Sequence, residues 1–224
     1  MDRLSFYKNT DLGYISKQLA EIINGRLDGG QPVLWLLSGG SAILVAVTAA
    51  RLISAADKPA LTVGLIDERY GPPGHPDSNW TQLLAAGFSL PGARLEPVLR
   101  GLDFEATAEA YDNFYSAAVN HDTYKIGLLG MGADGHTAGL LPGSPAIDSE
   151  KYVDRYVGPD YKRITLSARG IKSLDKAVLY AAGKAKRQAI HNLTKNLDPA
   201  KQPVQLLKLV DDVDVYNDVI GEQL

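Results

Sequence analysis

The chain has no cysteine among its 224 residues, which excludes disulfide bonds and thiolate chemistry. It has no run of basic residues and a net charge of −3, so the electrostatic pattern of a nucleic-acid-binding protein is missing. No apolar window reaches the roughly 18 residues that a membrane-spanning helix needs. Charged residues are spread through the first part of the sequence, where we expect no signal peptide. These absences predict a soluble, cytoplasmic protein without nucleic-acid or membrane partners.

The sequence does contain enough apolar residues for a large core. Hydrophobic residues make up 45% of the chain and charged residues 22%, which is typical of globular rather than disordered proteins. No repeat or linker-like segment interrupts it, and α/β folds of this length often form undivided. We therefore expect a single domain over residues 1–224. The composition says nothing about the oligomeric state.

Short apolar runs alternate with segments of helical apolar spacing along the chain. The alternation predicts an α/β fold, a three-layer, Rossmann-like and mostly parallel sheet with helices on both faces. Residues 152–161 are expected to be irregular, and a helix or helical turn is expected to begin near His136. The expected strands cover 33–37, 61–66, 125–129, 163–167 and 177–183, with weaker candidates at 1–10 and 204–210. The expected helices cover 11–27, 42–56, 80–88, 103–120 and 185–197.

Small residues follow the strand expected at 33–37: Ser38, Gly39, Gly40 and Ser41 stand directly before a helix. Such a turn can present several backbone N–H groups to an anion at a helix N-terminus. It is equally typical of a tight connection in which glycine allows close packing. The four residues alone leave both interpretations open.

Charged and polar residues follow the next strand. Asp67 and Arg69 belong to the tetrad DERY, which could also be only a solvated strand exit. Asn79 lies in a helix N-cap region, and Arg163 begins a later strand. Lys186 stands in the first turn of a helix, where a cation opposes the helix dipole unless an anion offsets it.

A third polar cluster lies in the stretch KIGLLGMGADGHTAGLLPGS, residues 125–144. Closely spaced glycines surround Asp134 and His136 at the end of an apolar run. A histidine can act as a general base near neutral pH, and a helix start at this point would favour its neutral form. Because parallel strands end at one edge of a sheet, we expect the clusters at 38–41, 67–70 and 130–136 to lie together.

These motifs resemble the 6-phosphogluconolactonases, which share a superfamily with glucosamine-6-phosphate deaminase/isomerase. The resemblance rests on SGGS, on DER with HPDSNW after it, on LLGMGADGHTAGLLPGS and on RITLS, and it covers roughly residues 30–190. Two departures stand out. Ala42-Ile43 replaces the usual Thr-Pro after SGGS, and VGPDYK precedes RITL where the family commonly has a proline pair.

The resemblance implies an enzyme that hydrolyses 6-phospho-D-glucono-1,5-lactone in the oxidative pentose phosphate pathway. It implies His136 as the base that activates water and Asp134 as the residue that orients it. Arg69 would bind the phosphate or the oxyanion, and Asp67 would hold a sugar hydroxyl or orient Arg69. No residues stand at metal-ligand spacing, so we expect no metal and no cofactor. The ligand-binding residues implied are Ser38, Gly39, Gly40, Ser41, Asn79, Arg163 and Lys186.

Three alternative functions compete with lactone hydrolysis. An isomerase or deaminase of the same superfamily typically has an asparagine and a glutamate where this chain has Leu140 and Leu141, and leucine cannot shuttle a proton. A non-catalytic sugar-phosphate sensor would be expected to lack the base, yet Asp134 and His136 are present. A Rossmann dinucleotide enzyme is excluded because no G-x-G-x-x-G opens the first helix.

Overall fold

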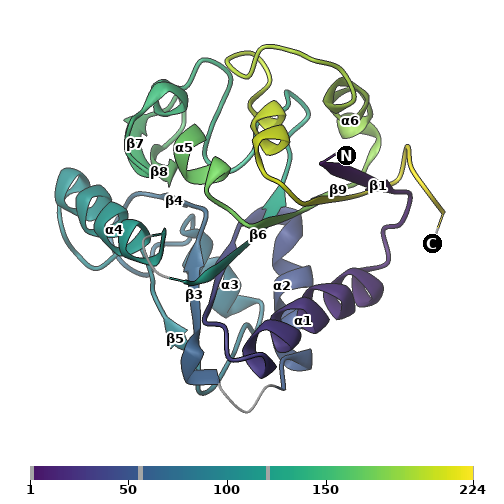
Figure 1. Ribbon diagram of the computed structural model, residues 1–224. Coiled ribbons are helices and arrows are strands. Elements are labelled where there is room, and N and C mark those ends of the chain that lie inside the picture. Colours follow the sequence, from purple (N-terminus) through teal and green to yellow (C-terminus); the bar gives the residue numbers. More distant parts are fainter. Residues whose placement is uncertain (1–2, 55–57, 120–121, 224) are drawn as a thin grey trace.

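The computed structural model describes residues 3–54, 58–119 and 122–223, and a seven-stranded sheet runs through the middle of this part of the chain (Figure 1). All neighbouring strands of this sheet are parallel, in the order β1-β10-β9-β6-β2-β3-β5. The strands are β1 (Leu4–Tyr7), β2 (Val33–Leu37), β3 (Leu61–Leu65), β5 (Arg94–Leu95), β6 (Tyr124–Gly130), β9 (Lys176–Ala181) and β10 (Val213–Asn217).

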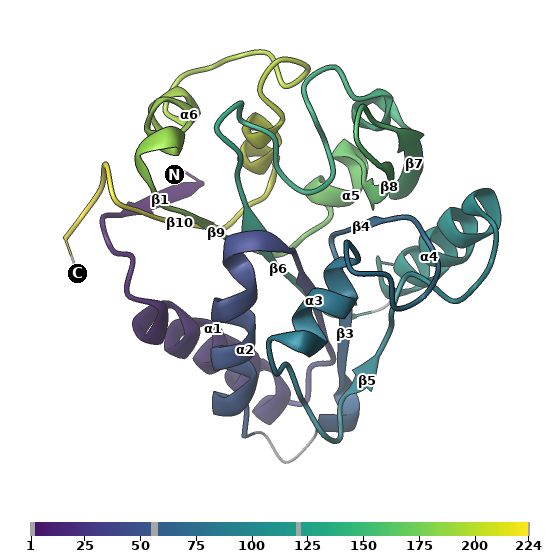
Figure 2. The ribbon, with the colours of Figure 1, turned by 180° about the vertical axis from the view of Figure 1, so that it is seen from behind.

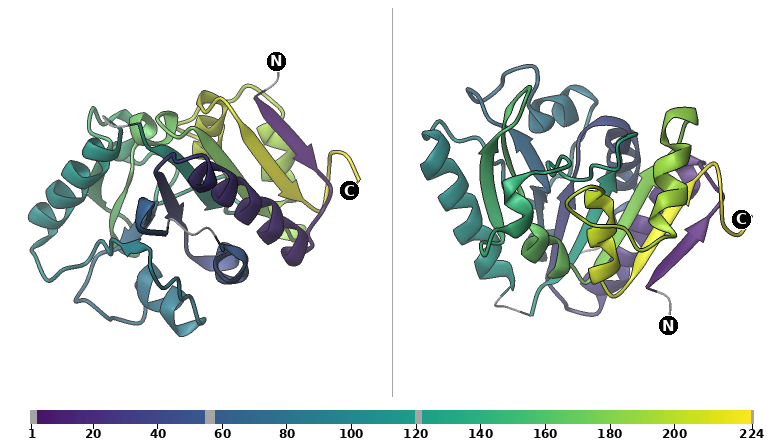
Figure 3. Two further views of the ribbon diagram at one scale, coloured as in Figure 1. Left: turned by 60° about the horizontal axis from the view of Figure 1, so that its bottom comes forward. Right: turned by 90° about the horizontal axis from the view of Figure 1, so that it is seen from above.

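Helices cover both faces of the large sheet, as the sequence predicts. Helices α1 and α2 lie on one face, and α5 and α6 lie on the other (Figures 1 and 3). Seen from behind, α2 and α3 stand in front of the sheet, and α4 lies to one side, where it packs against β7 (Figure 2). The helices are α1 (Leu12–Asp28), α2 (Ile43–Leu52), α3 (Asn79–Ala85), α4 (Phe104–Val119), α5 (Ala168–Lys172) and α6 (Arg187–Leu193), with short 3-10 helices η1 (Gly40–Ala42), η2 (Lys58–Ala60), η3 (Pro145–Asp148), η4 (Lys184–Lys186) and η5 (Pro203–Leu209).

Local chemistry sets where the helices begin and end. The side chain of Asp11 caps α1 by accepting a hydrogen bond from Tyr14 N at 2.8 Å. After α1 the chain turns at Gly30, whose φ of +77° is a conformation that glycine adopts without strain. Ser78 caps α3 in the same way as Asp11 caps α1, by accepting from Thr81 N.

A second sheet of three antiparallel strands, in the order β4-β8-β7, stands at the end of the large one. It is built from β4 (Asp67–Arg69), β7 (Val153–Val157) and β8 (Lys162–Leu166). The prediction of an irregular segment at 152–161 was therefore wrong in part. The expected strand at 163–167 belongs to this sheet, because β8 pairs with β4 and β7 and not with the parallel strands.

Three further sequence predictions were wrong. No helix begins at His136, because Gly135 (φ +82°) and Ala138 (φ +53°) hold the chain in turns. The apolar run at 204–210 forms η5 rather than a strand, and the strand is β10 in the acidic segment after it. The predicted helix at 185–197 ends at Leu193. Two expected helices extended to Ala56 and Asn120, which lie outside the described residues.

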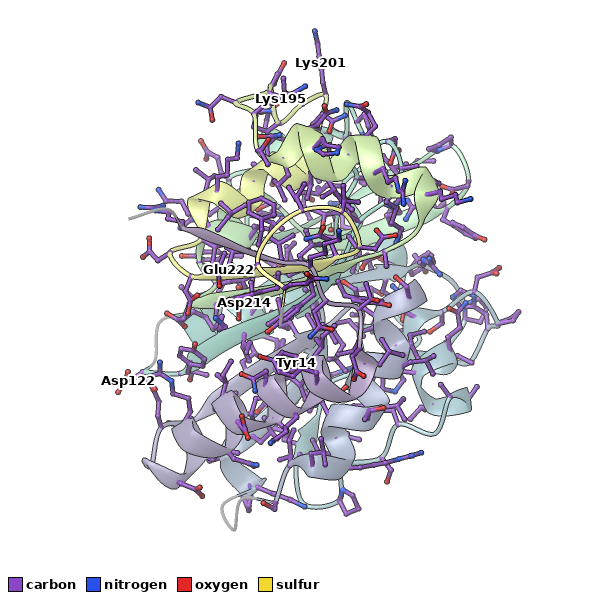
Figure 4. All side chains as sticks on the ribbon, turned by 90° about the vertical axis from the view of Figure 1, so that its right-hand side faces the viewer. Tyr14, Asp122, Lys195, Lys201, Asp214 and Glu222 are labelled. Atoms are coloured by element: carbon purple, nitrogen blue, oxygen red, sulfur yellow. The ribbon has the colours of Figure 1, made fainter. Side chains whose placement is uncertain are left out.

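The outer edge of the large sheet is closed by aromatic rings. Tyr7 stacks on Tyr216 with ring centroids 5.1 Å apart, and Tyr14 of α1 meets Tyr216 edge-on at 6.4 Å. Figure 4 views the molecule from this side, with Tyr14 on α1 below Asp214 on β10. Helix α1 is thereby fixed under this edge of the sheet. Within the described residues, no helix has both the length and the apolar character that a membrane crossing requires.

The central strand gives a stability prediction. Trp35 of β2 is fully buried, packs against Phe88, and has no hydrogen-bond partner for its indole N–H among the described residues. Trp35→Ala should lower the free energy of unfolding by about 3–5 kcal/mol because it leaves a large cavity. Trp35→Phe should cost less than about 1.5 kcal/mol, because it keeps most of the ring volume and removes an unpaired donor. Urea denaturation measures both; equal losses would contradict this account.

Candidate active site

A pocket of about 390 Å³ opens at the carboxyl ends of β2 and β6, beside β4 and β8. All three polar clusters of the sequence reach it, as the parallel arrangement predicts. Its lining residues are Ser38, Gly39, Gly40, Ser41, Asp67, Arg69, Gly130, Met131, Gly132, His136, Ala138, Asp160, Tyr161, Arg163 and Lys186.

The Ser38–Ser41 turn forms one wall of the pocket. Gly40 adopts φ +66°, and a Cβ on Gly39 would collide with the side-chain amide of Asn79. The N–H groups of this turn stand at the start of η1 and α2, where a helix leaves its first donors without helical partners. The buried hydroxyl of Ser38 also has no partner among the described residues. The wall is therefore rich in donors.

Asp67 on β4 is a buried carboxyl in the floor of the pocket. Burial raises its pKa, although Arg69, Arg163 and a hydrogen bond from Asn79 act in the opposite direction. Asn79 Nδ2 donates to the carbonyl oxygen of Asp67 at 2.9 Å and to its carboxylate at 3.3 Å. Asn79 is buried behind Asp67 and Gly39 and does not line the pocket, and its neighbour Ser78 provides the helix cap.

Glu68, which the sequence analysis did not select, connects β4 to α3. Its fully buried carboxylate accepts hydrogen bonds from Asn79 N at 2.6 Å, Trp80 N at 3.1 Å and Ser78 Oγ at 2.9 Å. It also accepts from the backbone N–H of Arg69 at 2.8 Å. Two sequence features could have pointed to Glu68. It is an acidic residue next to an expected strand end, and the helix start at HPDSNW offers backbone N–H groups that a carboxylate can accept from. Only the tertiary structure brings the two segments together.

Arg69 and Arg163 project from paired positions of β4 and β8. Arg69 Nη1 donates to the carbonyl oxygen of Asp77 at 2.8 Å, and Arg163 Nη2 donates to both carboxylate oxygens of Asp160 at 2.9 Å. The ring of Tyr161 lies 5.6 Å from one guanidinium and 5.7 Å from the other. The Nε atom of each arginine is buried without a partner among the described residues, so each keeps an unused donor.

Asp134 and His136 form a close pair on the loop after β6. His136 Nδ1 lies 2.7 Å from Asp134 Oδ1, and His136 N donates to the same oxygen at 3.1 Å. Partial burial opposes the charge of Asp134, but the hydrogen bonds and charge of His136 lower its pKa below the usual value. Gly132 allows this geometry, because a Cβ there would collide with the imidazole ring. An ionised Asp134 therefore holds the ring through Nδ1, and the helix start that was expected to favour the neutral imidazole does not form at His136.

Lys186 closes the pocket from η4. Its Nζ lies 3.4 Å from Ser41 Oγ, and burial lowers its pKa. The other lining residues that the sequence analysis did not select are Met131, Ala138, Asp160 and Tyr161, together with Gly130 and Gly132 of the glycine series. Asp160 and Tyr161 belong to a hairpin turn that the sequence analysis took as irregular, so their position depends on the pairing of β7 with β8.

Known proteins resemble this chain in sequence and in fold. The family model described as "Glucosamine-6-phosphate isomerases/6-phosphogluconolactonase" matches residues 13–215. The chain belongs to this family. The model includes both branches, so membership alone does not choose between lactone hydrolysis and isomerisation.

Three individual proteins illustrate the similarity. The human GDH/6PGL endoplasmic bifunctional protein is 33% identical over 154 residues, which cover 62% of this chain and 19% of that protein. A probable chloroplastic 6-phosphogluconolactonase 3 of rice (Oryza sativa subsp. indica) is 29% identical, with 69% of this chain and 54% of that protein covered. The chain thus spans about half or less of these two relatives. The crystal structure of 6-phosphogluconolactonase from Thermotoga maritima shares the fold, with a TM-score of 0.82, 19% identity and coverage of 96% and 98%.

The raised pKa of Asp67 gives a pH-dependent prediction. The folded protein holds this proton more tightly than the unfolded chain, so the resulting stability is fully present below about pH 3.9 and is lost as the pH rises through the folded pKa. Asp67→Asn cannot ionise. Its free energy of unfolding relative to the wild type should therefore increase from pH 4 to pH 8 in urea titrations. Asn113→Ala, at an exposed residue of α4 that carries no titratable group, is the control, and its difference from the wild type should not change with pH. A pH-independent difference for Asp67→Asn would refute the prediction.

Proposed function

We propose that the chain hydrolyses 6-phospho-D-glucono-1,5-lactone to 6-phospho-D-gluconate, a reaction of the oxidative pentose phosphate pathway. The observation that carries the proposal is the 2.7 Å pair of Asp134 and His136 beside a pocket with three cationic side chains. A base next to an anion-binding pocket suits a substrate that carries both an electrophilic carbonyl and a phosphate. Family membership and the names of the relatives support the same reaction.

His136 acts as the general base. An ionised carboxylate only accepts hydrogen bonds, so Asp134 selects the tautomer with the proton on Nδ1 and leaves Nε2 as an acceptor. Nε2 takes a proton from a water molecule while the water oxygen bonds to C1 of the lactone. Such assistance contributes about 10²–10⁴-fold to the rate.

The remaining steps need charge stabilisation and one proton. The carbonyl oxygen becomes an oxyanion, which the guanidinium of Arg69 is suited to stabilise. When the oxyanion collapses, the bond between C1 and the ring oxygen breaks, and the imidazolium returns its proton to that oxygen. The product carboxylic acid then releases its own proton to solvent. One water molecule is consumed and His136 is restored to its neutral form. Asp67 holds a sugar hydroxyl and helps to orient Arg69.

The phosphate provides binding energy away from the reacting carbon. The N–H groups of Gly39, Gly40 and Ser41, the Ser41 hydroxyl and Lys186 form one group of donors. A bound dianion would also offset the desolvation that lowers the pKa of Lys186. Asn79 lies behind this wall, against Gly39.

The isomerase alternative is weaker because its carboxylate is missing. Leu140 is fully buried in the hydrophobic core, and Leu141 follows it. Neither side chain can move a proton between two carbon atoms. The pocket also retains the histidine that a non-catalytic sensor would not need.

The direct test is an assay of the purified protein with freshly prepared 6-phosphogluconolactone, with acid release as the measurement. We expect hydrolysis well above the spontaneous rate. His136→Ala should lower kcat by about 10²–10⁴-fold while 6-phosphogluconate still binds, because the proposed phosphate donors belong to other segments, the 38–41 turn and η4. His191→Ala, on the exposed side of α6, is the matched control and should keep full activity.

The outcomes separate the candidates. A wild-type protein that binds 6-phosphogluconate but gives no rate above background would exclude the lactonase and favour the sensor. Loss of both binding and activity in His136→Ala would show that the histidine is structural. Isomerisation of glucosamine 6-phosphate without lactone hydrolysis would favour the other branch of the family.

A further inference from the structure

The two arginines of the pocket stand in an arrangement that requires an anion. Arg69 and Arg163 are directly opposite each other in the antiparallel pairing of β4 and β8, so both side chains extend from the same face of the sheet. Like charges at directly opposite positions are destabilising. Both residues also line the same pocket, so their charges face one ligand space.

Asp67 lies near both arginines, and the carboxylate that hydrogen-bonds directly to Arg163 is that of Asp160. Both of its oxygens accept from Arg163 Nη2 at 2.9 Å, and Oδ1 also accepts from Tyr161 N at 2.9 Å. Burial opposes the charge of Asp160, but the hydrogen bonds and the positive charge of Arg163 together lower its pKa below the usual value, so the carboxylate is charged at neutral pH.

The two partners of this ion pair are held very differently. The side chain of Arg163 is 9% exposed and is fixed on a central strand of the small sheet, whereas that of Asp160 is 51% exposed. Asp160 belongs to the turn between β7 and β8, which is closed by a hydrogen bond from Gly158 N to Tyr161 O at 2.8 Å. The anion can therefore move into solvent, and the cation cannot.

We propose that Asp160 is a specificity-determining residue that occupies the Arg163 guanidinium in the empty pocket and is displaced by an anionic group of the ligand. The inference rests on the proposed function, because it takes a phosphorylated sugar acid or its lactone as the ligand. Binding then exchanges one carboxylate for another anion on the same arginine. A neutral sugar cannot make this exchange, so Asp160 selects for charged ligands and weakens their apparent affinity.

The ligand anion that displaces Asp160 can be either of two groups. The lactone carries a phosphate, whereas the product carries a phosphate and a carboxylate. Competition with the phosphate would weaken both substrate and product binding. Competition with the carboxylate would weaken product binding alone and so favour product release.

Calorimetric titration of Asp160→Asn tests the proposal. Asparagine can still accept from Tyr161 N and so keep the turn, but it carries no charge. If the Asp160 carboxylate is paired with Arg163 in about nine tenths of the unbound molecules, only about one tenth are ready to bind. Removing the Asp160 charge should then lower the apparent Kd by about tenfold. Asp160→Glu keeps the negative charge, so its apparent Kd should stay closer to that of the wild type than to that of Asp160→Asn. Glu109→Gln, an exposed residue of α4 outside the pocket, changes the net charge equally and should leave the Kd unchanged.

Two ligands identify the group that displaces Asp160. Tighter binding of both D-glucitol 6-phosphate and 6-phosphogluconate to Asp160→Asn would identify the phosphate. A gain confined to 6-phosphogluconate would identify the carboxylate. Unchanged or weaker binding of both ligands by a folded Asp160→Asn protein would overturn the proposal, as would a wild-type protein that binds neither. These titrations need no turnover, so a protein that binds as expected but does not hydrolyse the lactone would refute the proposed function alone.

Discussion

The buried carboxylate of Glu68 joins two segments on which the rest of the pocket depends. It accepts hydrogen bonds from three groups at the start of α3 and from the backbone of β4, so the helix and the strand cannot shift independently. Burial raises the pKa of Glu68, and the four donors act against that rise. This junction places the Asn79 side chain so that it donates a hydrogen bond to the Asp67 carboxylate. The backbone of Gly39 packs closely against the same Asn79 amide, because glycine has no Cβ to collide with it. The carboxyl floor and the donor-rich wall of the pocket thus share one support.

The small antiparallel sheet explains the charge pattern of the site. A purely parallel sheet would bring only its strand ends to the ligand edge. Here β4 continues beyond β3 and pairs with β8, which places Arg69 opposite Arg163 and brings the Asp160–Tyr161 turn over both. The pocket consequently contains Arg69, Arg163 and Lys186 together with Asp67 and Asp160. Cations that are partly compensated within the protein favour a ligand that brings its own negative charge.

The loop after β6 orients its histidine by local contacts rather than by a helix. Gly132 N donates to His136 O at 2.9 Å, and Thr137 Oγ1 donates to Gly130 O at 2.8 Å, which closes the loop on itself. The segment after α6 supports it from behind, since Val204 N donates to Gly135 O at 2.9 Å. The imidazole is held by a carboxylate and a compact turn, which suits a base that must present one nitrogen to the pocket.

The sequence by itself determined the α/β class, the main parallel strands and the meeting of three polar clusters at one edge, because apolar runs, glycine turns and strand direction are local or follow from simple topology. It also identified His136, Asp134, Arg69, Arg163 and Lys186 as candidates, through residue types whose chemistry is evident without coordinates. Only the tertiary structure decided that β8 leaves the parallel sheet, that Glu68 joins β4 to α3, and that Asp160 pairs with Arg163. The pairing of β4 with β8 joins segments about a hundred residues apart in the chain, whereas the Asp160–Arg163 and Glu68–Asn79 contacts are closer in sequence but depend on how β4, β7, β8 and α3 pack. Neither periodicity nor local propensity contains information about such pairing, because it is selected by the packing of the whole core.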